Sequence, residues 1–275
     1  MNRPDTSGIF YEGKKPMSQH TTFIKLKTSQ EPKLRLLCFP YAGGGTATFV
    51  PYAKSLPNHV ELWVIQPPGK CARIKEAPYE TMAPLVEEIC QAWLGSPDVP
   101  SVFWGHSLGS RIALEFTHQL SVLGAPLPVG FIASGSKCPR KRAIASGIAS
   151  LTDRDFVQRV RQIGGMEPQI AEHEELLSLV LPGLKADFRI AETYTYIGSS
   201  GLPLSVPLCL FSGRHDSLAP SSEMAGWRSL FEHCVESRIF EGDHFFIDHQ
   251  IDDVAKALNY ILNQALELLA SCSEC

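Results

Sequence analysis

The stretch SVFWGHSLGSRIALE, residues 101–115, decides the fold expected for this chain. An apolar run leads into a five-residue turn of the form G-x-S-x-G, and a segment with helical spacing follows. A serine at a sharp turn between a strand and a helix has a strained backbone, and glycines at positions 105 and 109 remove the clashes. The pattern predicts a nucleophile elbow that exposes Ser107 Oγ at the N-terminus of a helix.

Segments of strand and helix character alternate along most of the chain. Besides the elbow strand and a helix running from the elbow to about 123, strands are expected at 22–27, 33–39, 60–65, 129–133, 206–212 and 234–240, and helices at 46–56, 82–94, 221–231 and 252–269. Such alternation implies an α/β fold, with a mostly parallel sheet and helices on both faces.

Residues 139–205 break this alternation, because no convincing strand occurs there. Thr152 begins a helix that closes at 164–165, and a helical pattern over 174–194 is interrupted at Pro182. Such an insertion suits a lid over a site, and extra core packing is the alternative. We expect one domain over 21–275 with a helical lid insertion at about 140–200, preceded by a flexible leader over 1–20.

Composition and charge exclude several classes of function. The 275 residues are 44% hydrophobic and 20% charged, as in an ordinary soluble globular protein, and the formal net charge of −4 gives no footprint for nucleic acid. No apolar run approaches the roughly 20 residues that span a bilayer, and residues 1–20 lack the apolar core of a secretory signal. We expect neither a nucleic-acid partner nor membrane association.

The eight cysteines show no pairing at zinc-site spacing. Cys38 and Cys209 lie in apolar strands, where a reduced thiol packs as a small hydrophobe. Cys272 and Cys275 have redox-motif spacing without the βαβ context of such motifs. We expect reduced thiols and a cytoplasmic location, with no metal.

Catalysis by Ser107 requires a base, and the base requires an orienting acid. In folds with this elbow the order along the chain is serine, acid, histidine, each in a loop after a strand. His244 alone among the nine histidines lies in a turn just after the last strand, and Asp216 follows the strand before it. Asp187, in the helical insertion, is the rival acid, and Asp243 is expected to shape the histidine's turn. We predict the triad Ser107, Asp216 and His244.

The glycine-rich segment PYAGGG, residues 40–45, follows the second strand. A phosphate cradle would need Gly-Lys-Ser/Thr, or G-x-G-x-x-G with a later acid, and neither is present. An oxyanion loop needs only N–H groups beside the nucleophile, and a plain tight turn is the alternative. We expect the backbone N–H groups of Leu108 and Ala42 to form the oxyanion hole, with Tyr41 and Gly43 as alternatives to Ala42.

Several motifs in this order resemble the type II thioesterases of polyketide and nonribosomal peptide synthesis, which are α/β-hydrolases. They are FPYAGG at 39–44, Pro68-Gly69 with Arg73 and Glu76, GHSLG at 105–109, LPGLKADF at 181–188, Gly213-x-x-Asp216 and GDHFF at 242–246. The resemblance covers about 34–262. It implies an α/β-hydrolase fold and a serine thioesterase that needs no cofactor. Its substrates would be acyl chains on the phosphopantetheine arms of acyl or peptidyl carrier proteins, removed for editing or product release.

The chain departs from this family at two places within the domain, and its leader before Thr21 has no family counterpart. Lys70 stands where the family usually has arginine, and Ser110-Arg111 replaces a small or apolar pair, which we expect to change packing under the lid. Residues 137–142, KCPRKR, form a dense basic cluster. A solvated loop is the favoured interpretation of this cluster, and docking of an acidic carrier protein is the alternative.

Three functions fit these residues. The first is the thioester hydrolase, in which Ser107 attacks the thioester and water releases the acid. The second transfers or cyclises the acyl group on the same fold, since water and another nucleophile compete for one acyl-serine. The third is a non-catalytic hydrolase-like binding protein, against which an intact triad argues. The absence of a fused carrier domain in the sequence favours hydrolysis.

Overall fold

The computed structural model describes residues 21–273 apart from 146, 167 and 198–202. The expected leader at 1–20 and Cys275 therefore lie outside the described residues, and the side chain of Cys272 is likewise not described. No helix in the described part of the chain is both long and apolar enough to cross a membrane.

The described strands form one seven-stranded sheet in the order β1-β3-β2-β4-β5-β6-β7. The strands are β1 (Phe23–Lys27), β2 (Leu34–Phe39), β3 (Val60–Ile65), β4 (Ser101–His106), β5 (Gly130–Ser134), β6 (Leu208–Gly213) and β7 (Cys234–Phe240). Only β1 pairs antiparallel, and the other pairs are parallel. Every residue of β2 to β6 is buried, as expected for parallel strands covered on both faces. The expected α/β-hydrolase fold class is confirmed.

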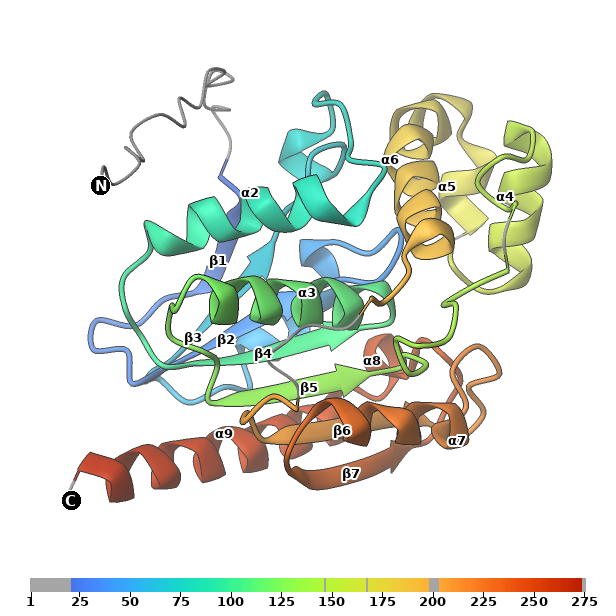
Figure 1. Cartoon of the computed structure of the whole chain (residues 1–275). Helices are drawn as coiled ribbons and strands as arrows, with labels where there is room; N and C mark the ends of the chain where they lie inside the picture. Colours follow the sequence, from blue (N-terminus) through green and yellow to red (C-terminus); the bar gives the residue numbers. More distant parts are fainter. Residues whose placement is uncertain (1–20, 146, 167, 198–202, 274–275) are drawn as a thin grey trace, which may run out of the picture.

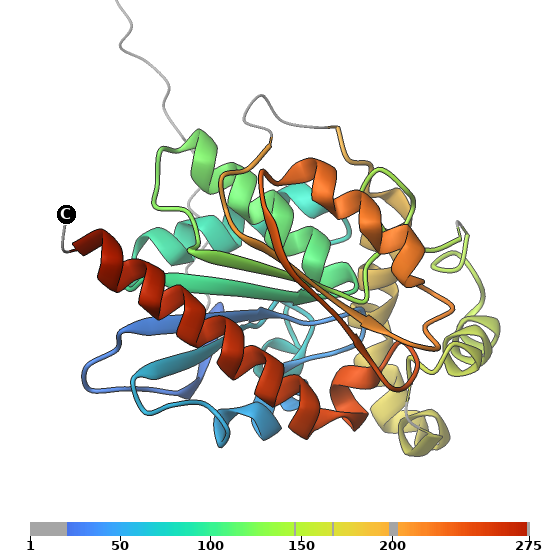
Figure 2. The ribbon, with the colours of Figure 1, turned by 90° about the horizontal axis from the view of Figure 1, so that it is seen from below.

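Helices cover both faces of the sheet (Figures 1 and 2). They are α1 (Val50–Ala53), α2 (Met82–Leu94), α3 (Leu108–Val122), α4 (Asp153–Gln162), α5 (Pro168–Glu172), α6 (Glu174–Thr193), α7 (Ser221–Met224), α8 (Phe246–His249) and α9 (Ile251–Ser273), with 3-10 turns at Thr46–Phe49, Cys71–Arg73 and Ala225–Leu230. Helices α2 and α3 lie on one face and α9 on the other.

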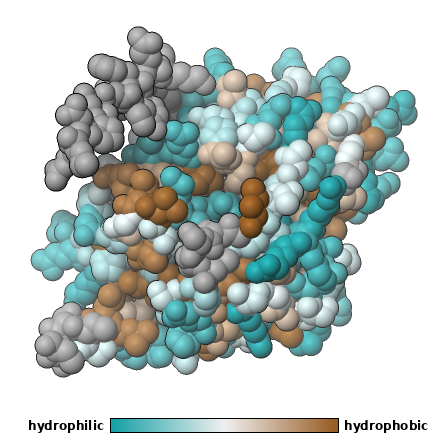
Figure 3. Space-filling model, in the orientation of Figure 1, coloured by the Kyte–Doolittle hydropathy of each residue, from teal (hydrophilic) through white to brown (hydrophobic). Residues whose placement is uncertain are grey.

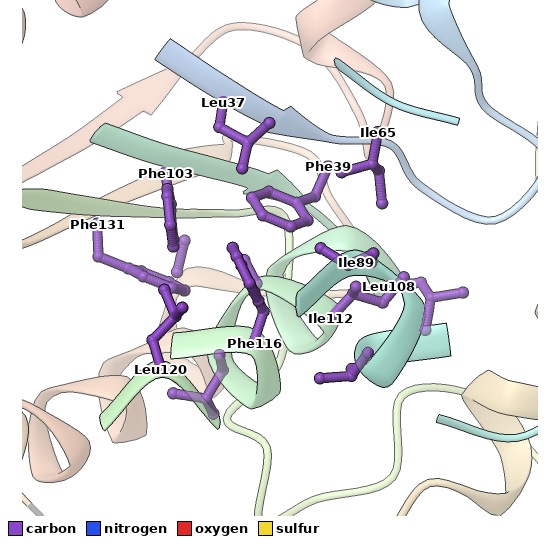
Figure 4. Close-up of a cluster of buried hydrophobic side chains, with 14 of the residues drawn as sticks. Leu37, Phe39, Ile65, Ile89, Phe103, Leu108, Ile112, Phe116, Leu120 and Phe131 are labelled. Atoms are coloured by element: carbon purple, nitrogen blue, oxygen red, sulfur yellow. The ribbon is translucent and has the colours of Figure 1, made fainter. Parts of the chain in front are cut away.

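Alternate residues of each central strand enter different cores. On β4, Phe103 joins the core under α2 and α3, whereas Val102 and Trp104 join the core under α9. Figure 4 shows the first of these cores, where Phe103 lies against Phe116 of α3 with ring centroids 5.2 Å apart. The period of two along the strand therefore fixes the sheet between two apolar layers.

Four expected helices differ in extent from the sequence-based prediction. Residues 46–56 form a 3-10 turn and the single turn α1, and 221–231 form the short α7 followed by a 3-10 turn. Helix α9 extends to Ser273. The predicted interruption at Pro182 is wrong, because α6 runs through it without a break. Apolar side chains on both sides of Pro182, Leu181 and Leu184, are buried, and this packing compensates for the lost backbone hydrogen bond.

Helices α4 to α6 lie together beyond the end of the sheet toward which β4 and β5 point (Figure 1). They have a small apolar core of their own, in which Phe156 of α4 meets Phe188 of α6 at a centroid separation of 5.2 Å. Thr152 caps α4, its hydroxyl accepting the N–H of Asp155. The helical insertion is thus a packed unit at the edge where parallel strands deliver their loops.

The outer surface in the view of Figure 3 is mostly hydrophilic or neutral, and apolar side chains form separate patches on it. Scattered exposed apolar residues of this kind are ordinary on soluble domains and mark no site by themselves.

Candidate active site

Ser107 occupies the sharp turn between β4 and α3. Its backbone has φ 54° and ψ −117°, a left-handed conformation that a serine adopts only under constraint. A Cβ on Gly105 would lie 2.4 Å from the Ser110 backbone, and a Cβ on Gly109 would lie 1.9 Å from the Phe39 carbonyl oxygen. Both glycines are therefore sterically required, as the elbow pattern predicts.

The structure brings Ser107, His244 and Asp216 into one hydrogen-bonded chain. His244 Nε2 lies 2.9 Å from Ser107 Oγ, and His244 Nδ1 lies 2.8 Å from Asp216 Oδ2. His244 is in the loop between β7 and α8, and Asp216 is in the loop after β6. The three loops meet at the carboxyl edge of the sheet, where they were expected. This geometry suits a serine nucleophile, a histidine base and an orienting acid.

Asp216 is held as a carboxylate. Its side chain is buried, which opposes ionisation, but the hydrogen bond and charge of His244 and the N–H of Ala219 hold its pKa below the ordinary value. Its second oxygen, Oδ1, accepts the backbone N–H groups of Leu218 at 2.9 Å and Ala219 at 2.7 Å. Both oxygens are thus occupied, and the one facing His244 is fixed in direction.

The segment after β2 forms a tight turn beside the elbow. The Gly44 N–H donates to the Tyr41 carbonyl at 2.9 Å, and Gly43 has φ +84°, as the third residue of a type II turn requires. Gly43 N–H donates to Asp187 Oδ2 at 2.7 Å, so it is already engaged. Among the described residues the Ala42 N–H donates no hydrogen bond. Between Ala42 and Gly43, the Ala42 N–H is therefore the one free to meet an oxyanion, and Tyr41 stays the other predicted alternative.

Leu108 is the first residue of α3, so its N–H has no acceptor one turn earlier in the helix. A developing negative charge on a carbonyl attacked by Ser107 would lie at the positive end of that helix. The described residues contain no group of three or more His, Cys, Asp or Glu side chains arranged to hold a metal ion.

A family model for the thioesterase domain matches residues 34–262. The chain belongs to the thioesterase family. Thioesterase PikA5 of Streptomyces venezuelae is 31% identical over 229 residues, which are 82% of this chain and 80% of PikA5. The gramicidin S biosynthesis protein GrsT of Aneurinibacillus migulanus is 29% identical over 82% of this chain and 87% of its own length.

The solved structure of YbtT, a type II thioesterase from the yersiniabactin NRPS/PKS biosynthetic pathway, superposes with a TM-score of 0.79 at 28% identity. The match covers 90% of this chain and 100% of that one. The resemblance to type II thioesterases is thereby confirmed, and the chain is an enzyme of the hydrolase class.

This thioesterase places the rival acid Asp187 away from His244. Asp187 is buried on α6, where it accepts Gly43 N–H and forms an ion pair with Lys70. Lys70 also donates to the Gly44 carbonyl at 3.3 Å. The structure therefore associates Asp187 with the turn at 41–44, a contact that sequence reasoning did not foresee.

His106, inside the elbow, has a role that sequence reasoning missed. It points away from Ser107, as expected, but its fully buried ring bridges Ser134 Oγ and the His244 carbonyl, each 2.8 Å away. Burial, together with the charge of neighbouring His244, lowers the pKa of His106 to about 3, so the ring is neutral. The one signal for this role in the sequence is the histidine at the second position of the GHSLG motif.

Ser110 and Arg111, which stand where the family usually has a small or apolar pair, are both buried and make polar contacts. Ser110 Oγ donates to the Gly105 carbonyl at 2.6 Å, inside the elbow. Arg111 is fully buried and donates to the carbonyls of Lys141 at 2.9 Å and Lys137 at 3.2 Å. Burial lowers its pKa to about 10. The guanidinium thus ties the elbow helix to the chain that leads into the insertion.

The basic cluster at 137–142 is partly neutralised. Lys137 and Lys141 lie 3.3 and 3.6 Å from the carboxylate of Glu223, and the Arg140 guanidinium lies 5.8 Å from the centre of the Tyr196 ring. These contacts favour the interpretation as a solvated loop.

Proposed function

We propose that this thioesterase hydrolyses acyl thioesters carried on the phosphopantetheine arms of acyl or peptidyl carrier proteins. The observation that carries the chemistry is the hydrogen-bonded chain Ser107–His244–Asp216. The choice of substrate is supported by YbtT, whose name places it in an NRPS/PKS biosynthetic pathway. Clearing of stalled chains and release of products are the two roles compatible with this reaction.

In the acylation step, Ser107 Oγ attacks the thioester carbonyl and His244 Nε2 takes the hydroxyl proton. Asp216 holds the imidazole in the required tautomer and stabilises the imidazolium. The oxyanion would accept the N–H groups of Leu108 and Ala42, each contributing on the order of 3 kcal/mol to lowering the barrier. Collapse of the intermediate breaks the carbon–sulfur bond, and the pantetheine thiol leaves with the proton from His244.

In the second step, water attacks the acyl-serine while His244 takes its proton. The new tetrahedral intermediate collapses, Ser107 regains its proton, and the free acid departs. Neither step calls for a metal or an organic cofactor. Buried free thiols at Cys38 and Cys209 suit a reducing compartment, so we place the enzyme in the cytoplasm.

The insertion at about 140–200 is proposed as the lid over this site. Its elements reach both functional loops: a Cβ on Gly164 would lie 3.0 Å from the ring of Phe245, beside His244. On the other side, Leu184 Cδ1 would lie 2.7 Å from a Cβ on Gly43. An acyl chain entering between these contacts would be shielded from water by α4 to α6.

The test loads a carrier protein with short and medium acyl chains and identifies the products by mass. Wild type should release the free acid, and Ser107→Ala should lose activity by several orders of magnitude. Ser229→Ala, an exposed serine substitution, is the matched control and should leave activity unchanged. Undiminished hydrolysis by Ser107→Ala would overturn the mechanism, and a cyclised or transferred product would show the alternative release chemistry instead.

A further inference from the structure

The carboxylate of Asp187 on α6 makes two contacts through a single oxygen. Oδ2 accepts the backbone N–H of Gly43 at 2.7 Å and forms an ion pair with Lys70 Nζ. The Asp187 and Lys70 side chains are only 10% and 12% exposed. Lys70 Nζ also donates to the carbonyl of Gly44 at 3.3 Å. One acid–base pair thus holds a backbone group of each of two consecutive residues, Gly43 and Gly44.

Helix α6 is seated against this turn without room for adjustment. A Cβ on Gly183 would lie 2.3 Å from the carbonyl oxygen of Gly69, so the helix backbone contacts the loop that carries Lys70. One residue later, Leu184 Cδ1 would lie 2.7 Å from a Cβ on Gly43. The position of Asp187 is therefore set by backbone packing rather than by a flexible surface contact.

The Gly43 N–H belongs to the central peptide of the turn, the peptide that reverses direction when a type II turn converts to type I. While Asp187 holds that N–H, the peptide cannot reverse and Gly43 keeps its φ of +84°. Ala42, whose N–H is the predicted second oxyanion donor beside that of Leu108, is joined directly to this peptide. A small change in its orientation would move the donor off the oxyanion.

We propose that Asp187, with Lys70 as its counter-charge, is a positioning residue that fixes the 41–44 turn and keeps the Ala42 N–H directed at the oxyanion. This inference rests on the proposed function, because it assumes that Ala42 stabilises an oxyanion formed on attack by Ser107. Because Asp187 lies on α6, the proposal also makes the geometry of the oxyanion hole depend on the position of α6. A displaced insertion would leave the serine and its base intact but the oxyanion hole incomplete.

The variants compared are Asp187→Ala, Asp187→Asn and Lys70→Met. The control is Asp153→Ala, which breaks the ion pair between Asp153 of α4 and Lys185 of α6 without touching the turn. For Asp187→Ala we expect kcat to fall about 10-fold to 100-fold, as for a misplaced catalytic group, with little change in KM. Asp187→Asn should retain most of the activity, since its amide oxygen still accepts the Gly43 N–H. The control should match wild type.

A second readout is the affinity for an acyl trifluoromethyl ketone. Ser107 Oγ adds to its carbonyl carbon, His244 takes the proton, and the adduct places a stable oxyanion in the hole. Asp187→Ala should weaken this affinity by the same factor as kcat. Binding of an uncleavable acyl-pantetheine amide should stay as in wild type, because that ligand carries no oxyanion.

The two readouts separate this proposal from the proposed function. Equal trifluoromethyl ketone affinities in Asp187→Ala and Asp153→Ala would overturn the positioning role, whether or not carrier thioesters are hydrolysed. Weakened affinity without carrier thioester hydrolysis in wild type would support the positioning role and overturn the substrate assignment. Should Asp187→Ala fail to fold, Lys70→Met is compared with the matched control Lys185→Met, and equal affinities there overturn the proposal.

Discussion

His106 Nε2 lies 2.8 Å from the backbone carbonyl oxygen of His244. A carbonyl can only accept, so Nε2 carries the ring proton and Nδ1 accepts the hydroxyl proton of Ser134 at 2.8 Å. The strand that ends in the elbow is thereby joined to the loop that supplies the proposed base. Ser107 and His244 keep their relative positions through a buried, neutral histidine.

Replacing His106 with phenylalanine should destabilise the fold and slow the reaction. The substitution fills the volume but leaves the His244 carbonyl and the Ser134 hydroxyl buried without this partner, at a cost of about 1–3 kcal/mol each. We expect kcat to fall about 10-fold as the base loop shifts. Urea unfolding measures the loss of stability, and steady-state kinetics measures the fall in kcat. The control is His215→Phe, at an exposed histidine. If His106→Phe is as stable as the control, His106 does not hold the His244 loop against the elbow strand.

The stability of the wild type should decline in acid through His106. Its pKa falls from 6.5 to about 3 on folding, so between these values the unfolded chain binds a proton that the folded chain does not. Its contribution is complete above about pH 6.5 and is lost, by about 1.4 kcal/mol per pH unit, as the pH falls toward 3. Unfolding free energies of His106→Phe should therefore depend less steeply on pH between 4 and 6. If the unfolding free energies of wild type and His106→Phe change with pH in parallel, His106 is not the source of the acid sensitivity.

Asp216→Asn should abolish most of the activity without unfolding the protein. The amide oxygen can keep the N–H groups of Leu218 and Ala219, but the amide nitrogen then faces His244 and imposes the wrong tautomer. A loss on the order of 10⁴-fold in kcat is expected, as for the equivalent change in a serine protease. Asp243→Asn is the matched control, because within the described part of the chain the Asp243 side chain accepts one hydrogen bond, from the N–H of Phe245. The larger loss in Asp243→Asn would reverse the assignment.

Arg111→Met should loosen the chain that leads into the insertion. The variant removes the hydrogen bonds to the carbonyls of Lys137 and Lys141, while methionine fills much of the space. Limited trypsin digestion should then cleave within 137–143 faster than in wild type. Glu223→Gln, which disrupts only partly exposed ion pairs in the same place, should change the rate much less. If Arg111→Met is digested at the wild-type rate, the hydrogen bonds of Arg111 do not order residues 137–143.

The elbow and the triad order could be predicted because each depends on local chemistry or on a general rule of topology. The glycines at 105 and 109 indicate a turn too tight for a Cβ. A parallel sheet brings the loops after successive strands to one edge. His244 and Asp216 follow from that rule once Ser107 is located. The helix boundaries were harder, since α6 passes through Pro182 and its apolar neighbours on both sides are buried in tertiary contacts.

The alternation of strands and helices, the serine turn and the residues expected to meet it are all encoded in short stretches of sequence. The contacts that hold these parts in place form only when distant segments pack together. Gly43 and Asp187 are 144 positions apart, and His106 and His244 are 138 positions apart. In each contact a side chain meets a backbone group, which every residue possesses, so neither partner carries a pattern that identifies the other. Packing of the whole chain sets such distances, and local sequence does not encode them.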